Sequence, residues 1–283
     1  MRAITLNLSA WIFLPIMDGL AKSLSADLPV LQITWARYFF TVIFILPIMF
    51  FFFKKNLVRS NNPKLQLIRG LILLIANILF FFAISKISLP KALTLAFVSP
   101  LIVTTFSPIF LGEKVGFKRW SAVIIGFIGC LVVIRPGFVE INLASLAALG
   151  TGIMYGFYLI ITRKLSISDN SLLTLLLTGV VGTIMISAVM PFVWVKPTLN
   201  QWSMMAAIGI FACIGHLLLI LSLKYADASK LAPFSYFEIV ANIIISYYYF
   251  AELPDNWTFL GLFIIVLCGI YISSSEKIVI KIK

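Results

Sequence analysis

Two apolar stretches of equal length, in corresponding positions of the two halves of the chain, constrain the fold more than any other feature. Lys91–Glu113 reads KALTLAFVSPLIVTTFSPIFLGE, and Lys230–Glu252 reads KLAPFSYFEIVANIIISYYYFAE. Both stretches begin with Lys and end with Glu, and their corresponding ends are 139 residues apart. Each is long enough to cross a bilayer as a helix. Paired segments of this kind are typical of transporters built from internal repeats.

The composition predicts an integral membrane protein. Of the 283 residues, 61% are hydrophobic and 11% are charged, whereas a soluble chain carries about 25% charged residues. Unbroken apolar runs such as VIFILPIMFFFF, residues 42–53, exclude the alternating pattern of a barrel strand and leave helices. We therefore expect an all-α integral membrane fold with ten transmembrane helices, arranged as two inverted five-helix repeats.

The apolar runs place these spans at about 4–25, 30–53, 65–85, 88–111, 118–135, 142–163, 172–195, 202–224, 229–251 and 257–275. Residues 1–140 would form the first repeat with helices one to five, and residues 141–283 the second with helices six to ten. Five is an odd number, so the two halves would insert with opposite orientations. Lys and Arg gather in the loops on the side of the termini, which predicts that both termini are cytoplasmic and that the chain crosses the inner membrane several times.

Charged residues inside the predicted spans are the strongest functional signal. Glu238 lies near the middle of its helix, where a carboxylate is costly and is a functional-site hypothesis by default. Its counterpart at the 139-residue offset is Ser99. Asp18 and Arg37 are equally distant from the first predicted turn, so they would lie at the same depth in an antiparallel hairpin. We expect them to pair, either as a gate or as a structural contact between two helices.

Other polar and aromatic residues inside the spans complete a candidate substrate-binding set. That set is Trp11, Asn77, Ser99, Tyr155, His216, Tyr236, Glu238 and Asn242. For several of these a packing role is the competing interpretation, because a single Asn or Tyr in a membrane helix often makes only an interhelical contact. His216 is either a hydrogen-bonding core residue or a proton-sensitive group of the path.

The sequence argues against other classes of protein. The cysteines and the one histidine show no metal-ligand spacing, which predicts no metal and no cofactor. HExxH, GxSxG and glycine-rich phosphate loops are not found, so a membrane-embedded enzyme is a weak alternative. The net charge of +12 is explained by basic loops that set topology, so no nucleic acid is expected. A small metabolite and the lipid bilayer are the expected partners, and both a monomer and a homodimer remain open.

The pattern resembles a known family. The GE that closes helix four, the AE that closes helix nine, and GFIGCLVVIRPG in helix five are similar to EamA-type carriers of the drug/metabolite transporter superfamily. DGLAKSLS, WARYFF and DASKLAPFSYFEIV most resemble the branch named for S-adenosylmethionine uptake. The resemblance implies a central cavity between two repeats, with Ser99, Tyr236 and Glu238 on cavity helices and Glu113 and Glu252 in a helix-end motif.

The resemblance implies a carrier that works by alternating access. A cavity with Glu238 and several aromatic rings suits a cationic or zwitterionic metabolite. S-adenosylmethionine or an amino acid is the expected cargo; riboflavin or another flat metabolite, imported or exported, is the alternative. The sequence does not distinguish import from export, or proton coupling from exchange or facilitation.

Overall fold

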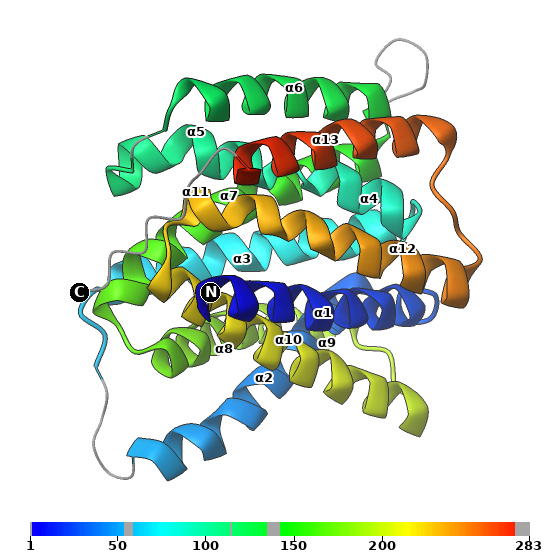
Figure 1. Cartoon of the computed structure of the whole chain (residues 1–283). Helices are drawn as coiled ribbons and strands as arrows, with labels where there is room; N and C mark the ends of the chain where they lie inside the picture. Colours follow the sequence, from blue (N-terminus) through cyan, green and yellow to red (C-terminus); the bar gives the residue numbers. More distant parts are fainter. Residues whose placement is uncertain (1, 54–58, 114, 135–141, 275–283) are drawn as a thin grey trace.

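The computed structural model is a bundle of helices (Figure 1). It describes residues 2–53, 59–113, 115–134 and 142–274. The elements are α1 Arg2–Leu24, α2 Val30–Phe53, α3 Pro63–Ile84, α4 Leu89–Ala96, α5 Ser99–Leu111, α6 Phe117–Ile134, α7 Leu143–Ser168, α8 Ser171–Ser187, α9 Met190–Val193, α10 Leu199–Tyr225, α11 Ala228–Leu231, the 3₁₀ helix η1 Ala232–Tyr236, α12 Phe237–Phe250 and α13 Asn256–Ser274. The described residues contain no strand, in agreement with the all-α prediction.

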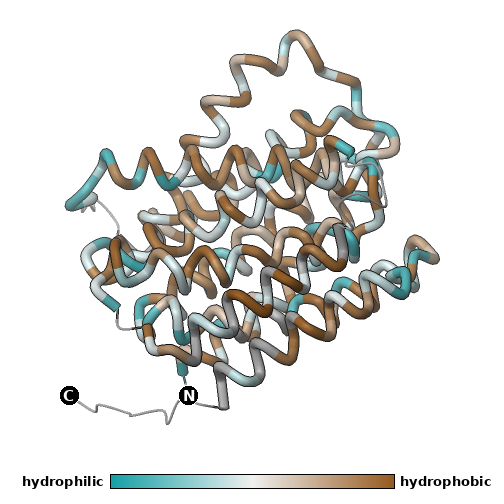
Figure 2. Tube along the Cα trace, turned by 90° about the horizontal axis from the view of Figure 1, so that it is seen from above, coloured by the Kyte–Doolittle hydropathy of each residue, from teal (hydrophilic) through white to brown (hydrophobic). Residues whose placement is uncertain are grey.

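The helices are apolar enough to lie in a membrane. Within the described chain, six helical segments have the length and composition of a span: Arg2–Leu24, Val30–Phe51, Pro63–Ile84, Leu89–Leu111, Leu143–Ser168 and Leu199–Tyr225. Figure 2 shows hydrophobic residues along most of the helices, with hydrophilic residues gathered mainly near their ends. This distribution agrees with an integral membrane protein that crosses the bilayer several times.

Side chains at the helix starts show why several helices begin where they do. The Asn142 side chain accepts a hydrogen bond from the Ser145 amide at the start of α7, and Asn170 accepts from the amides at the start of α8. Thr198 and Gln201 form a capping box at the start of α10. These side chains satisfy amides that have no partner within the helix. Each of these apolar helices therefore begins directly after a polar capping residue.

The bundle is held together mainly by contacts between helices from different halves of the sequence. α1 packs against α10, α3 packs against α7, and α2 packs against both α8 and α10. α6 packs against α13, and these two helices lie side by side at the top of Figure 1. The core therefore runs through the middle of the bundle, where α1, α3, α7 and α10 meet.

Two of the predicted single spans are interrupted near their middle. The first stops at Ala96 and resumes at Ser99, just before Pro100. Pro100 has no amide hydrogen, so the carbonyl of Ala96, four residues earlier, loses its usual helical partner. The second is a succession of α11, the 3₁₀ helix η1 and α12, with the last break directly before Phe237. The 3₁₀ segment was not predicted from the sequence.

Candidate functional site

A cavity lies where the two interrupted helices meet α1, α3, α7 and α10. It has an empty volume of about 640 Å³, which includes the solvent at its opening. Its lining contains the predicted site residues Trp11, Asp18, Asn77, Ser99, Tyr155, His216 and Glu238, together with Leu14, Met17, Ala76, Phe80, Leu93, Ala96, Phe97, Thr151, Leu159 and Ser235. The cavity thus brings together six residues of the predicted substrate-binding set and Asp18, which was predicted as a gating or structural residue.

Two carboxylates face this cavity. Asp18 comes from α1 and is 3% exposed, and Glu238 comes from the first turn of α12. Among the described residues, neither carboxylate has a hydrogen bond or an ion pair with a side chain or an amide. A cavity with two such carboxylates favours a positively charged guest, because a carboxylate in a membrane interior needs a counter-charge. The pair can therefore bind the cationic part of a guest.

The rest of the wall is largely apolar and aromatic. The indole Nε1–H of Trp11 donates to Asn7 Oδ1 at 2.8 Å, so its hydrogen-bonding need is met outside the cavity. Tyr155 stacks on Tyr158 with ring centroids 5.3 Å apart. Asn77 donates from Nδ2 to Tyr38 Oη at 2.8 Å and to the Leu73 carbonyl at 2.6 Å. Aromatic faces beside carboxylates suit a guest with a flat or positively charged part.

No hydrogen bond or ion pair joins Asp18 and Arg37 in the described part of the chain, although the charge of Arg37 acts on Asp18. Arg37 Nη2 instead lies 2.6 Å from His216 Nε2 on α10. The prediction assumed that α1 and α2 form a packed hairpin, but α1 packs on α10 and α12, and α2 packs on α8 and α10. Equal depth was therefore not enough, since the partner of Arg37 comes from α10.

His216 connects two arginines through a chain of hydrogen bonds. A guanidinium can only donate, so His216 Nε2 must be the acceptor from Arg37. Nδ1 then carries the hydrogen and donates to the Tyr158 hydroxyl at 3.0 Å, and that hydroxyl also accepts from Arg69 Nη2 at 2.8 Å. The ring is thus a neutral tautomer in this conformation, which favours the hydrogen-bonding role over the proton-sensitive one.

Arg69 lies at the centre of the bundle, although it is not among the residues predicted for the site. It lies on α3, is fully buried, and donates from Nε to Thr162 Oγ1 at 2.7 Å and from Nη1 to the Thr174 carbonyl at 3.1 Å and to Thr178 Oγ1. α3 begins at Pro63, close to the predicted residue 65, and proline is favoured at the first position of a helix. Arg69 thus also lies inside the predicted span, and that position was the available signal.

Two predicted site residues lie apart from the cavity wall or outside the description. Asn242 is completely buried and donates from Nδ2 to the carbonyl of Glu238 at 3.2 Å, so it supports the turn of α12 that carries Glu238. The side chain of Tyr236 is outside the described residues, although its backbone belongs to η1.

The two glutamates that close the paired stretches bind backbone amides just before the opposite stretch. Glu113, after α5, accepts hydrogen bonds from the amides of Ala228 and Ser229 at 3.1 and 3.2 Å, where α11 begins. Glu252, after α12, accepts one from the amide of Leu89 at 3.3 Å, where α4 begins. Carboxylates are favourable at helix starts, where amides are free and the helix dipole is positive.

A basic side chain completes each of these two helix-end sites. Lys22 Nζ lies 3.0 Å from Glu252 Oε2 and also donates to the carbonyl of Ile84, at the end of α3. Arg163 Nη2 lies 3.0 Å from Asp227 Oδ1, and its Nη1 donates to the carbonyl of Leu223, near the end of α10. Burial opposes the charged form of Asp227, but Lys230 and Arg163 outweigh it and hold the pKa of this carboxyl below its ordinary value.

Known membrane transporters resemble this chain over nearly its whole length. The model of the EamA-like transporter family matches residues 1–135 and 142–275. The S-adenosylmethionine uptake transporter of Rickettsia bellii is 26% identical over 92% of this chain and 89% of its own length. The riboflavin transporter of Vibrio cholerae is 26% identical over 95% and 92%, and the pseudopaline exporter of Pseudomonas aeruginosa is 26% identical over 93% and 92%.

A solved crystal structure has the same fold. It superposes with a TM-score of 0.74 and covers 96% of this chain and 96% of its own, at 17% sequence identity. An identity this low establishes the fold alone.

Proposed function

Because the chain belongs to the EamA-like transporter family, we propose that it carries a small cationic or zwitterionic metabolite across the inner membrane by alternating access. The family and the names of its relatives point to membrane transport rather than to an enzyme. The observation that carries the choice of cargo is the pair Asp18 and Glu238, two carboxylates without a partner among the described residues that border one cavity.

S-adenosylmethionine or an amino acid is the cargo class that this cavity favours. Both carry a positively charged group that Asp18 or Glu238 can bind. S-adenosylmethionine also has a flat ring system that can stack on Trp11 or Tyr155. The relatives from Rickettsia are named for S-adenosylmethionine uptake, which supports this choice. Riboflavin, named in the Vibrio relative, is the second candidate because it is flat; it is neutral and leaves the carboxylates without a counter-charge.

Two inverted five-helix repeats, residues 1–140 and 141–283, fit the helix contacts. Exchanging the halves turns the α1–α10 contact into the α7–α3 contact, and leaves α2 with α8 and α6 with α13 unchanged. The family model matches the two halves separately. In this arrangement α4 with α5 is one span, α8 with α9 another, and α11, η1 and α12 a third, which gives ten spans.

The two helix-end sites supply a physical basis for alternating access. The contact Glu252–Leu89 and the contact Glu113–Ala228 are related by the same 139-residue offset, and so are the carbonyls of Ile84 and Leu223 that bind Lys22 and Arg163. In inverted repeats, equivalent contacts lie at opposite faces of the membrane. We name them the Glu252 latch and the Glu113 latch, and we propose that each closes one face and opens in turn.

A smaller cavity continues from the main one toward the Glu113 latch. It has an empty volume of about 300 Å³ and is lined mainly by apolar residues, with Leu223, Ala228 and Leu231 near the latch. Trp11, Leu159 and Ser235 border both cavities and so form the wall between them. We propose that cargo passes this wall when the Glu113 latch opens.

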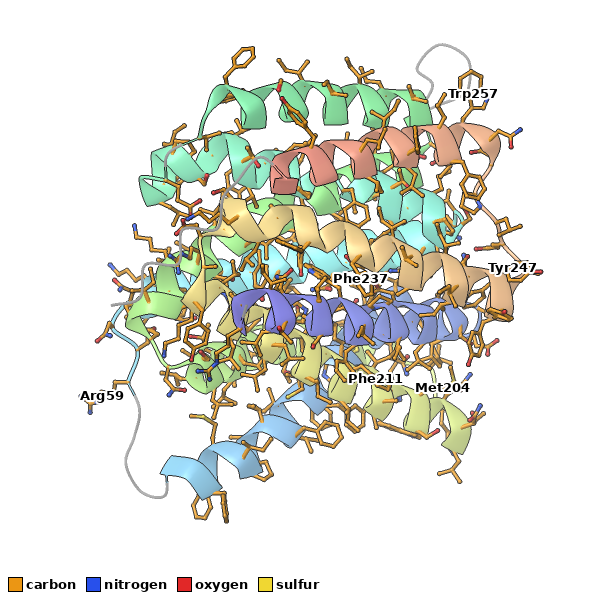
Figure 3. All side chains as sticks on the ribbon, in the orientation of Figure 1. Arg59, Met204, Phe211, Phe237, Tyr247 and Trp257 are labelled. Atoms are coloured by element: carbon orange, nitrogen blue, oxygen red, sulfur yellow. The ribbon has the colours of Figure 1, made fainter. Side chains whose placement is uncertain are left out.

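The face that carries the Glu113 latch is proposed to be cytoplasmic. Figure 3 places Arg59 at one end of the bundle and Tyr247 and Trp257 at the other. Basic residues collect on the cytoplasmic side of a membrane protein, and Tyr and Trp gather at membrane interfaces. With this orientation both termini are cytoplasmic and the Glu252 latch faces outward.

Ligand-induced thermal stabilisation tests the proposal. Purified wild type, Glu238→Gln and the exposed control Asp27→Asn are melted with S-adenosylmethionine, amino acids and riboflavin. A bound ligand raises the melting temperature by mass action. We expect a cationic or zwitterionic compound to stabilise wild type and Asp27→Asn but not Glu238→Gln. Stabilisation by riboflavin alone, or equal stabilisation of Glu238→Gln, would contradict the proposed site.

A further inference from the structure

The centre of the bundle holds two arginines that have no acidic partner. Arg37 is 2% exposed and Arg69 is fully buried. Within the described residues, neither forms an ion pair with a carboxylate. Charges inside membrane helices usually pair with one another or mark a substrate path, so each arginine needs an explanation.

Arg69 is explained by its neutral partners. Its Nε, Nη1 and Nη2 donate to Thr162, to Thr174 and Thr178, and to Tyr158 respectively. The guanidinium also lies over the Tyr158 ring, 4.6 Å from its centroid. All three nitrogens donate hydrogen bonds, as expected for a structural residue. Arg69 thereby holds the Tyr158 side chain in position.

Arg37 also lies over an aromatic ring, 4.6 Å from the centroid of Tyr38, but its hydrogen bonds are incomplete. Its Nε is buried and has no hydrogen-bond partner in the described part of the structure. Its contact with His216 is made to a neutral ring, which accepts a hydrogen bond but supplies no negative charge. A buried donor without a partner is destabilising, and more so when it is charged. Arg37 therefore keeps a free donor that an anion can accept.

Arg37 borders a cavity of its own next to the main one. This second cavity has an empty volume of about 240 Å³, which includes the solvent at its opening, and is also lined by Tyr38, Thr41, Thr178 and His216. His216 lines the main cavity as well, so its ring is shared by the two walls. A guest bound at Asp18 and Glu238 thus has a positively charged neighbour beyond His216.

We infer that Arg37 binds a carboxylate of the cargo, while Asp18 and Glu238 bind its cationic group. The inference rests on the proposed carrier function and narrows it: the cargo must carry both charges, as an α-amino acid group does. A guanidinium suits a carboxylate because its planar fork of donors matches the two oxygens. Arg37 and the two carboxylates thus offer one group for each charge of a zwitterion.

Matched pairs of ligands test this inference. S-adenosylmethionine, methionine, arginine and tryptophan are each compared with the amine that lacks the carboxylate, and dissociation constants are measured on the purified full-length protein. In wild type the acid should bind roughly tenfold to a hundredfold more tightly than its amine, as expected for a charged hydrogen bond. In Arg37→Gln this ratio should fall to about one, whereas in Asp18→Asn both members should weaken and the ratio should persist.

An amine that binds wild type as tightly as its acid, or a preference that survives Arg37→Gln, would overturn the inference. If Arg37→Gln does not fold, Arg37→Lys keeps the charge but not the fork, and its ratio should lie between one and the wild-type value. Binding of either member of a pair shows that the cavity takes these compounds. The carrier proposal is therefore judged by binding itself, and the role of Arg37 only by the ratio.

Discussion

Glu113, in the first half of the chain, caps the start of α11 in the second half, and Glu252 in turn caps the start of α4 in the first half. Glu113 accepts the amide hydrogen of Ala228, and Glu252 accepts that of Leu89, 139 residues earlier in the chain. These two reciprocal contacts join the two halves of the chain at both ends of the bundle. If the chain rocks between two states, these contacts are the ones that must alternate.

Neutralising one latch should shift the balance between the two states. Glu252→Gln keeps an acceptor but loses the ion pair with Lys22, and we expect it to favour the state open on that face. Glu113→Gln should favour the opposite state. A loss of about 1–2 kcal/mol corresponds to a roughly 5–30-fold change in population. Labelling of single cysteines near each latch by an impermeant thiol reagent measures the change, with Asp27→Asn as the control. Equal labelling changes in both variants would argue against alternating latches.

Replacing His216 should destabilise the protein through Arg37. His216→Leu removes the acceptor of Arg37 Nη2 and the donor to Tyr158, and we expect a loss of about 3 kcal/mol. Gln offers an oxygen and an amide group at similar reach, so His216→Gln should lose less than half as much. Thermal melting in detergent compares the two. A similar loss in both variants would mean that ring packing, rather than hydrogen bonding, is what His216 supplies.

The break between α4 and α5 requires a glycine on α7. A Cβ on Gly152 would overlap the carbonyl oxygen of Ala96, the group that Pro100 leaves without a helical partner. We expect Gly152→Ala to destabilise the protein by about 1–3 kcal/mol, as overpacking does. Gly116→Ala is the matched control, because nothing lies within 4 Å of its added Cβ. Equal melting temperatures for the two variants would contradict this close packing.

Asp169 gives the protein a predictable response to acid. Burial disfavours its carboxylate, but hydrogen bonds from Ser60, Gln66, Asn61 and Ser168 outweigh burial and lower its pKa below the ordinary 3.8. A pKa that is lower in the folded state stabilises the fold above the unfolded pKa, and this contribution is lost as the pH falls through the folded pKa.

Asp169→Asn should therefore melt at a lower temperature than wild type at pH 7. The difference should stay constant down to about pH 4 and close at lower pH, where the wild-type carboxylate also becomes protonated. Melting curves from pH 3 to pH 7 measure it. A difference that is the same at pH 3 and pH 7 would show that Asp169 acts through its shape rather than its charge.

The sequence predicted the depth of the charged residues in the membrane better than it predicted which neighbouring helix each side chain faces. Apolar runs predicted the helices, and the costs of buried charge singled out Asp18 and Glu238, which face one cavity. The partner of Arg37 was missed because depth along a helix says nothing about which neighbour the side chain faces. That choice depends on the packing of α2 against α10, a contact between residues far apart in the chain.

Transport by the purified protein in liposomes tests the central claim most directly. Vesicles loaded with unlabelled S-adenosylmethionine are given the labelled compound outside, and exchange is followed for wild type, Glu238→Gln and Asp27→Asn; the assay is repeated with an amino acid panel. The account predicts exchange of a zwitterionic or cationic compound by wild type and by Asp27→Asn, and a loss of at least about tenfold in Glu238→Gln. Exchange that Glu238→Gln leaves unchanged would contradict the claim that cargo passes through the cavity of Asp18 and Glu238.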